Sequence, residues 1–316
     1  MTGKQSGLSA RFIVGGYDLS GDISALDSIS GGVALLDVTD ITQSAHSRIT
    51  GQRDGSMGFS VYMDTSNAHP VLSALPSSDT LMTFLVPPLA IGSVSANLNA
   101  KQVGYDPTRN ADGSLMMKVQ GQGNEYGLEW CEQITPGLRS DTGATNGATQ
   151  DDGGGFATPS FPATTVPVTN TSPLPATVVI SGGTVGTVTI NGASAGSGDG
   201  TYTVPPGQTI AVTYTGSPSW TWTLQTAYGA QAYLSVTAFT GTSVTVAVQD
   251  SADGSTWAAV TGLTFTAATA APYTQRLATA NNATLRRYVR AVTTGTFSAA
   301  TFTAGINRNM AQGAAF

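Results

Sequence analysis

Apolar and polar residues alternate along most of this chain with a period of two, which is the repeat of a β-strand with one buried face. In one clear run, Phe59, Val61 and Met63 fall on the same face. Gly, Asn, Asp or Pro interrupts the alternation about every 8–12 residues, the spacing of short strands joined by turns. Two stretches differ, because 41–49 and 67–75 could each form one or two helical turns, the second with Asn67 as a cap and Pro70 at the first helical position. We therefore predict an all-β fold, either a β-barrel or a β-sandwich.

Composition then divides the chain into parts. Two parts carry long alternating runs with an Asp-Gly-Ser turn, a loose likeness that could mark two related halves of one domain. Between them lie a polar, Gly-rich stretch without periodicity, which predicts a flexible linker or a domain junction, and a segment with strands of its own. The expected boundaries are 1–140 for the first half of the main β domain, 141–155 for the linker, 156–223 for an inserted domain, 226–309 for the second half, and 310–316 for a C-terminal tail.

The inserted segment, residues 156–223, holds 16 Thr and no Lys or Arg, and it carries six short alternating runs separated by turns. This pattern predicts a small immunoglobulin-like β-sandwich. A Thr-rich low-complexity stalk is the alternative, and the regular alternation of Val, Ile, Tyr and Trp argues against it. Trp220 and Trp222 share one face of a strand. They either belong to the sandwich core or lie at the surface, where an aromatic pair can stack on the sugar rings of a host glycan.

Charged residues make up only 10% of the chain, against roughly 25% in a typical soluble domain. A surface built from Thr, Ser, Gly and Ala is more usual where neighbouring copies cover it. The net charge of −6 argues against a free nucleic-acid binder, which presents basic patches. Residues 1–152 hold 16 acidic and 8 basic residues, whereas residues 226–316 hold 2 acidic and 5 basic ones, so opposite ends of neighbouring subunits could attract. The candidates for inter-subunit contact are Arg286, Arg287, Arg290, Glu125 and Glu129.

The Ser, His and Cys residues that could take part in catalysis do not have the spacing that a catalytic site requires. Ser194 lies in a nominal G-x-S-x-G motif, but strands flank it and both His46 and His69 precede it. Cys131 beside Trp130 fits a small buried residue better than a nucleophile. Two His and one Cys at unrelated spacing do not make a metal site. We predict no enzymatic activity, no cofactor and no metal.

The sequence also predicts no membrane partner. The N-terminus lacks the apolar core of a signal peptide, and the longest apolar stretch, 81–91, is too short to span a bilayer. A single Cys excludes an intrachain disulfide, which is compatible with assembly in a reducing bacterial cytoplasm.

Several ordered motifs resemble those of the major tail proteins of phages that infect actinobacteria and their relatives. These motifs are the run GGYDLSGD at 15–22, Ser44-Ala45-His46 with Arg48, Arg53-Asp54-Gly55, the element at 68–76, the hairpin at 101–115, and the runs at 229–257 and 286–295. The resemblance covers most of the chain outside 156–223. That segment is similar to small β-sandwich modules carried by virion proteins, which implies an outward decoration.

The resemblance implies a tail-tube-like β fold whose subunits form stacked rings, each lending a sheet to a closed inner barrel. The rings would be hexameric, or trimeric and pseudo-hexameric if the subunit is doubled. It also implies a place in the virion tail, assembly in the host cytoplasm, other phage tail proteins as partners, and genomic DNA that passes during ejection without specific binding. The expected inter-ring arms are the junction 140–155 and the tail 310–316. The alternative function is a capsid decoration or fibre protein that binds host glycans through Trp220 and Trp222.

Overall fold

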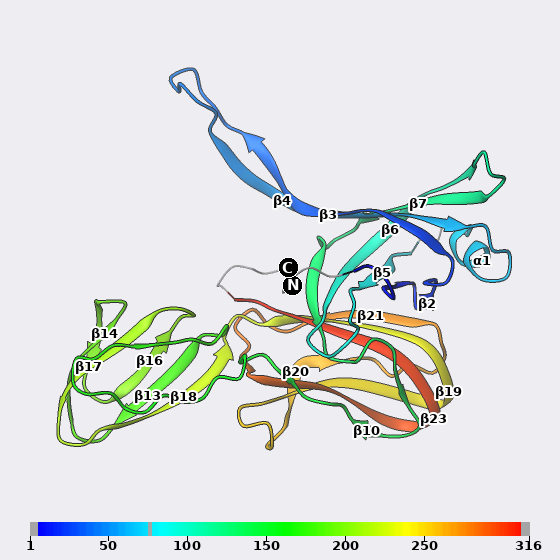
Figure 1. The fold of residues 1–316 in the computed structure, drawn as a ribbon. Coiled ribbons are helices and arrows are strands. Elements are labelled where there is room, and N and C mark those ends of the chain that lie inside the picture. The colour runs from blue at the N-terminus through cyan, green and yellow to red at the C-terminus, as the bar shows by residue number, and fades with distance from the viewer. Residues whose placement is uncertain (1–5, 75–77, 311–316) are drawn as a thin grey trace.

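The computed structural model describes residues 6–74 and 78–310, and within them the chain is built almost entirely of antiparallel strands. The predicted all-β fold is confirmed in its sandwich form, because the described sheets do not close into a barrel. Figure 1 shows three parts: a central body, a two-stranded arm formed by β3 (Ile23–Asp37) and β4 (Arg48–Tyr62), and a separate sandwich at one side. We call residues 32–54 the arm and residues 156–226 the module.

One continuous sheet runs through the body. Its first half contains β1 (Arg11–Val14), β2 (Tyr17–Asp18), β3, β4, β5 (Thr80–Leu85), β6 (Val94–Arg109), β7 (Leu115–Gly123) and β8 (Glu129–Gln133), with α1 (Ala68–Leu72) between β4 and β5. Its second half contains β9 (Arg139–Asp141), β10 (Thr145–Asn146), β11 (Gln150–Asp151), β19 (Ala230–Ser251), β20 (Ala258–Thr264), β21 (Tyr273–Ala278) and β23 (Tyr288–Arg308). The main strand order is β2-β1-β5-β6-β8-β23-β19-β20, so β8 joins the two halves by pairing with β6 and β23.

The module is a sandwich of two four-stranded sheets. One sheet has the order β12-β17-β14-β15, and the other has the order β16-β13-β18-β22. The bounds are β12 (Val168–Thr169), β13 (Ala176–Ser181), β14 (Thr184–Ile190), β15 (Ala193–Ser197), β16 (Gly200–Val204), β17 (Thr209–Thr215), β18 (Ser219–Thr226) and β22 (Leu285–Arg286). The body therefore contributes the edge strand β22 to the module, because Gln225 pairs with Arg286 and Thr226 with Leu285.

Each part buries its own apolar cluster, as the period-two pattern requires. The first half packs residues such as Phe12, Phe59, Leu72, Met82 and Leu98. The second half packs residues such as Leu234, Val246, Leu263, Phe302 and Ile306. The module packs residues such as Val178, Ile180, Val212, Trp220 and Trp222.

The segment predicted as a flexible linker is ordered. β10 and β11 both pair with β23, for example through Thr145 with Thr293. Upstream, Arg139 and Asp141 form a buried ion pair with a 2.7 Å contact, and Thr293 donates a hydrogen bond to the same carboxylate. Of the two interpretations of this stretch, the domain junction fits and the flexible linker does not, because backbone pairing and buried ion pairs hold it. Neither kind of contact leaves an apolar periodicity in the sequence.

Two local predictions fare differently. The short helix is present as α1, but Asn67 does not cap it through its side chain, since its amide donates to Asp22 instead. The module has one strand more than the six runs predicted, because β15 consists of exposed Ala, Ser and Gly and shows no alternation.

Candidate assembly surface

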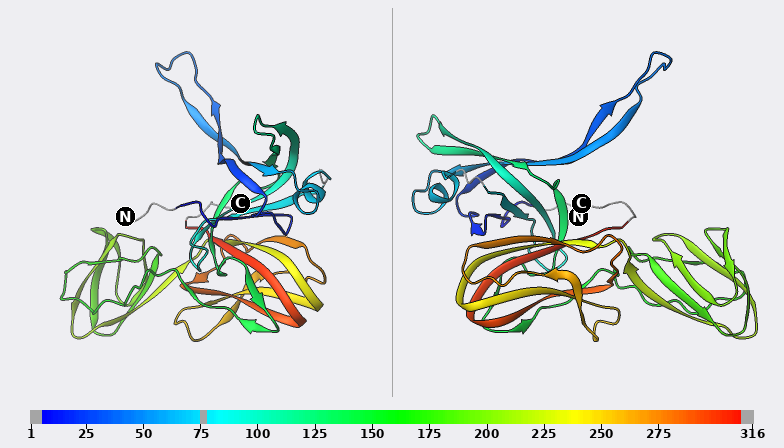
Figure 2. Two further views of the ribbon diagram at one scale, coloured as in Figure 1. Left: turned by 45° about the vertical axis from the view of Figure 1, so that its right-hand side comes forward. Right: turned by 180° about the vertical axis from the view of Figure 1, so that it is seen from behind.

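The arm is the most exposed part of the body. β3 and β4 pair from Ile23 with Val61 to Asp37 with Arg48, but only the stretch of β4 from Ser56 onward has a second neighbour, β7. Beyond that point the ribbon stands alone, and the views in Figures 1 and 2 show it projecting away from the body. Its exposed large apolar side chains are Val33, Leu35, Leu36, Val38, Ile41 and Ile49. Apolar residues gathered at this density on a free ribbon indicate a surface for another molecule.

One face of the arm carries a cross-strand apolar pair. Leu36 pairs with Ile49 in the register of the hairpin, and about half of each side chain is exposed. Ala34 lies on the same face, because a Cβ built on Gly51 would lie 3.3 Å from the Cβ of Ala34 and 3.4 Å from the Cγ of Leu36. At the tip, Ile41 is fully exposed. The arm therefore presents to solvent an apolar strip formed by Ala34, Leu36 and Ile49, and a separate apolar side chain at its tip.

The base of the arm is fixed by a glycine pair. Gly31 and Gly55 are register partners, and Leu128 packs against both of them. A Cβ built on Gly55 would lie 2.7 Å from the backbone nitrogen of Leu128, and one on Gly31 would lie 2.8 Å from the Cβ of Leu128. Arg53 adds a hydrogen bond of 3.1 Å from its guanidinium to the carbonyl of Leu128. The arm thus leaves the body from a close-packed base.

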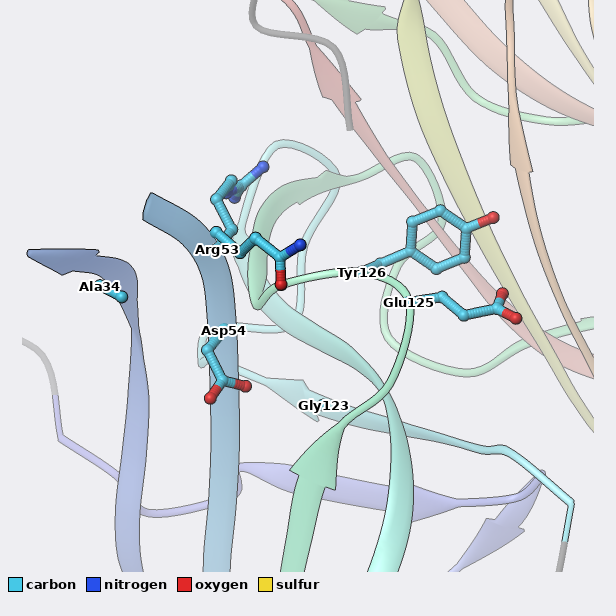
Figure 3. Close-up of a pocket in the computed structure, with 8 residues that line it drawn as sticks. Ala34, Arg53, Asp54, Gly123, Glu125 and Tyr126 are labelled. Atoms are coloured by element: carbon cyan, nitrogen blue, oxygen red, sulfur yellow. The ribbon is translucent and has the colours of Figure 1, made fainter. Parts of the chain in front are cut away.

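An open hollow of about 730 Å³ lies beside this base. Figure 3 shows that Arg53 and Asp54 reach it from β4, and that Glu125 and Tyr126 reach it from the loop after β7. Asp54 is held by hydrogen bonds of 2.7 Å from the Gly55 amide and 2.8 Å from Gln122. Glu125 is exposed, so this predicted contact residue does lie on the surface, next to the arm.

The arm also presents a free strand edge. Among the described strands, β3 pairs only with β4, so no second strand covers its outer edge. Such an edge is a template for pairing with another chain, and proteins usually shorten or cover it. An apolar strip and an open edge on one ribbon both indicate a contact between chains.

Glu129 is not a surface residue, and its prediction as an inter-subunit contact is wrong. It is 1% exposed and accepts a hydrogen bond from the Tyr233 hydroxyl and a 3.1 Å hydrogen bond from Arg276. The Arg276 guanidinium lies 3.7 Å from the centre of the Tyr126 ring. Burial, together with the charge of Glu129, raises the pKa of Tyr233 well above its usual value. This cluster fastens the two halves of the body to each other.

The arginine cluster is also engaged within the chain. Arg287 donates to both carboxylate oxygens of Asp151 at 2.6 and 2.8 Å, and these bonds raise the pKa of the guanidinium. Arg286 forms an ion pair of 3.2 Å with Asp250. Arg290 donates to Gln249 and lies 4.1 Å from the centre of the Trp257 ring. Within the chain this cluster holds the second half and the junction to the module, and its role in contacts with other subunits stays a prediction.

Trp220 and Trp222 belong to the module core. Each is 8% exposed, and their rings meet edge to face at 5.3 Å. Trp220 donates a hydrogen bond of 2.9 Å to the carbonyl of Pro159, and its ring also packs on Phe161 at 4.7 Å. Of the two interpretations of this pair, the core is correct, and stacking on a glycan is excluded because neither indole offers an open face.

The described residues contain no group of three or more His, Cys, Asp or Glu side chains placed to hold a metal ion. Ser194 lies within strand β15, not at a strand-to-helix turn. His69 contacts the Tyr105 hydroxyl at 2.8 Å, and His46 lies on the arm beside Asp37, also at 2.8 Å. In the part of the chain that the structure describes, no helix has the length and apolarity needed to cross a membrane.

Comparison of the chain with models of known protein families found no match, and comparison with curated proteins found none either. The functional argument therefore rests on the sequence and the structure. The arm is the main feature that the sequence analysis missed, since it assigned inter-ring contacts to 140–155 and 310–316. The first of these segments is paired with β23, and residues 311–316 lie outside the described part. The signal that could have located the arm is the run of large apolar residues between Val33 and Ile41.

Proposed function

We propose that this chain is a phage virion structural protein, a major tail protein that polymerises into stacked rings to form the tail tube. The arm carries this proposal. A two-stranded ribbon is marginally stable by itself in water, and this one exposes six large apolar side chains. A partner that covers the ribbon would both stabilise it and bury its exposed apolar side chains. In a homopolymer every subunit meets that partner, because the partner is another copy of the same chain.

The geometry of the arm favours open-ended assembly. The arm points away from the body, so the arm of one copy can contact the body of the next without the reverse contact, and such an interface is heterologous. Heterologous contacts close into rings or continue as filaments, depending on the rotation that relates the copies. The open edge of β3 supports the same proposal, since a strand from a neighbour could extend the sheet and cover the edge.

The proposed partners are further copies of the chain in hexameric or trimeric, pseudo-hexameric rings, together with other tail proteins. Genomic DNA passes through the tube without specific binding. The excess of acidic residues in the first half suits this role, with 16 acidic and 8 basic residues in 1–152. Affinity for phosphates depends mainly on Lys and Arg, so an acidic lining lets DNA slide. No catalytic or cofactor role is part of the proposal.

We assign the module to the outside of the tube. It lies to one side of the body in every view, and it is joined to the body through β22 and the junction at 151–156. Residues 153–225 contain a single charged residue, Asp199. A neutral domain beside the assembly surface can decorate the tube without disturbing the contacts between rings.

Negative-stain electron microscopy of the purified protein over a range of concentrations tests this proposal. Rings or hollow tubes would support the tail tube and give its symmetry directly. Discrete particles that attach to empty capsids would instead favour the capsid decoration protein, the alternative function.

A further inference from the structure

A second hollow lies where the body, the junction and the module meet. Its volume is about 290 Å³, at the small end of the range for ligand sites. β8 contributes Trp130 and Glu132, the segment after β11 contributes Asp152, and the end of β23 contributes Arg308. Pro173 and Leu174 of the module, with Ile306, Asn307 and Met310 of the body, complete the lining. We call this site the Trp130 hollow.

Trp130 is unusual among the tryptophans of this chain. It is 53% exposed, whereas Trp220 and Trp222 are each 8% exposed. It projects from β8, which is hydrogen-bonded on both sides, to β6 and to β23. The indole is therefore held on a rigid strand with much of its surface open. A large aromatic residue held in this way beside a hollow offers a binding platform.

Two buried charged groups meet in the same hollow. The side chain of Arg308 is 7% exposed and that of Asp152 is 4% exposed, and the two form an ion pair. Arg308 also donates a hydrogen bond of 3.2 Å from Nη2 to the carbonyl of Arg287. Among the described residues, Nη1 of Arg308 has no hydrogen-bonding partner, whereas the Asp152 side chain shares a hydrogen bond with the Glu132 carboxyl group. A buried N–H group without a partner is unfavourable, so Arg308 favours a ligand that can accept the missing hydrogen bond.

Glu132 shapes the polarity of the hollow. Desolvation at this position and the nearby charge of Asp152 raise its pKa to about 8, against the opposing charge of Arg308. At neutral pH the carboxyl group is therefore protonated and can donate a hydrogen bond. The hollow then holds one arginine, one carboxylate and one neutral carboxylic acid, with no excess of positive charge. This balance disfavours an anionic ligand, and the buried ion pair disfavours a purely apolar one.

We propose that the Trp130 hollow binds one ring of a neutral saccharide. A sugar ring has an apolar C–H face that can lie on an indole. Its neighbouring hydroxyl groups can accept a hydrogen bond from Nη1 of Arg308 and can donate one to the carboxyl groups of the hollow. The proposed site is independent of the assembly of the tube, and it is separate from the tryptophan pair in the module core.

The test is a titration of the purified full chain with the methyl glycosides of glucose, galactose, mannose, rhamnose and N-acetylglucosamine. Binding is followed by saturation-transfer NMR and by tryptophan fluorescence. We expect saturable binding of at least one glycoside, weakened by at least about tenfold in Trp130→Ala. Trp257→Phe is the matched control and should bind as the unmodified chain does. Circular dichroism checks that each variant is folded.

The pH dependence of binding gives a second test that does not require Trp130 to be changed. The charged and titratable groups that face Glu132 are Asp152 and Arg308. Binding should weaken as the pH rises through about 8, because a second carboxylate replaces the proton donor. Glu132→Gln keeps a neutral donor, so its binding should stay constant over the same range.

Three results would overturn the proposal. They are the lack of saturable binding to all five glycosides, equal binding by Trp130→Ala, and binding of the unmodified chain that does not change with pH. Loss of ring or tube formation in Trp130→Ala, with no glycoside bound by the unmodified chain, would assign the hollow to a contact between copies instead.

Discussion

Gly31 and Gly55 face each other across the β3–β4 hairpin where the arm leaves the body, and Leu128 fills the space that their side chains would occupy. This contact joins the arm to the loop that precedes β8, the strand that connects the two halves. The direction of the arm is thereby coupled to the packing of the body.

The glycine pair gives a first prediction. Gly55→Ala should lower the free energy of unfolding by about 1–3 kcal/mol, because the new Cβ would lie 2.7 Å from a backbone nitrogen that cannot move freely. Gly32→Ala is the matched control, since a Cβ there meets no atom within 4 Å. It should change stability by less than about 0.5 kcal/mol. Urea denaturation measures the free energy of unfolding of both variants. An equal loss of stability in Gly55→Ala and Gly32→Ala would show that the base of the arm is loosely packed.

The apolar strip on the arm gives a second prediction. The double variant Leu36→Ser with Ile49→Ser should assemble poorly while keeping nearly the unmodified melting temperature, because both side chains are already exposed in the single chain. Thr50→Ser on the same strand serves as the control and should assemble normally. Sedimentation velocity measures assembly, and scanning calorimetry measures the melting temperature. A large fall in melting temperature with normal assembly would mean that the strip stabilises the fold itself.

The buried cluster between the two halves gives a third prediction. Tyr233→Phe removes the hydroxyl that donates to Glu129 and accepts from Arg276 at 3.0 Å. Because Glu129 and Arg276 remain buried, we expect a loss of about 1–3 kcal/mol in the free energy of unfolding. Tyr273→Phe is a milder control, since the partners of its hydroxyl group, Gln275 and Thr266, are not buried, and its loss of stability should be smaller. A Tyr233→Phe variant as stable as its control would show that the cluster does not fasten the halves.

The raised pKa of Glu132 gives a fourth prediction, about stability. Between its ordinary pKa of 4.5 and its folded-state pKa of about 8, the folded chain holds a proton that the unfolded chain has released. Since the folded state binds more protons in this window, the contribution of Glu132 to the unfolding free energy falls as the pH rises from 4.5 to about 8, and it is constant above. Glu132→Gln should remove this slope. Denaturation experiments measure the unfolding free energy of the unmodified chain and of Glu132→Gln at each pH, and the difference between them isolates the contribution of Glu132. If the two unfolding free energies change with pH in parallel, the prediction is wrong.

The sequence predicted the parts of the fold that depend on local patterning. The alternation around Phe59 and Val61 identified a buried strand face, and both residues are fully buried in the first core. The short helix at His69 and Pro70 was also predicted, although Pro70 is the third residue of α1 and not the first, and the predicted turns at 41–49 are not helical. These features depend on neighbours in sequence, so periodicity and turn chemistry are enough to find them.

The features that the sequence analysis missed depend on distant partners. Arg287 and Asp151 are 136 residues apart, and Glu129 and Tyr233 are 104 residues apart, so their pairing leaves no local signal. In the sequence alone, arginines that pair with distant carboxylates of the same chain cannot be told from arginines that are free at the surface. The arm was missed for a related reason, because alternation predicts a strand but does not tell whether a third strand covers it.

The central claim is that the arm links one copy of the chain to the next. The most direct measurement is negative-stain electron microscopy of a variant in which the register partners Val33 and Arg53 are joined by an Asn-Gly turn in place of residues 34–52. The control shortens the β6–β7 hairpin by replacing residues 110–114 with the same turn. We predict rings or tubes from the unmodified chain and from the control, and single folded subunits from the variant without the arm. Tubes of unchanged symmetry from the variant without the arm would contradict the account.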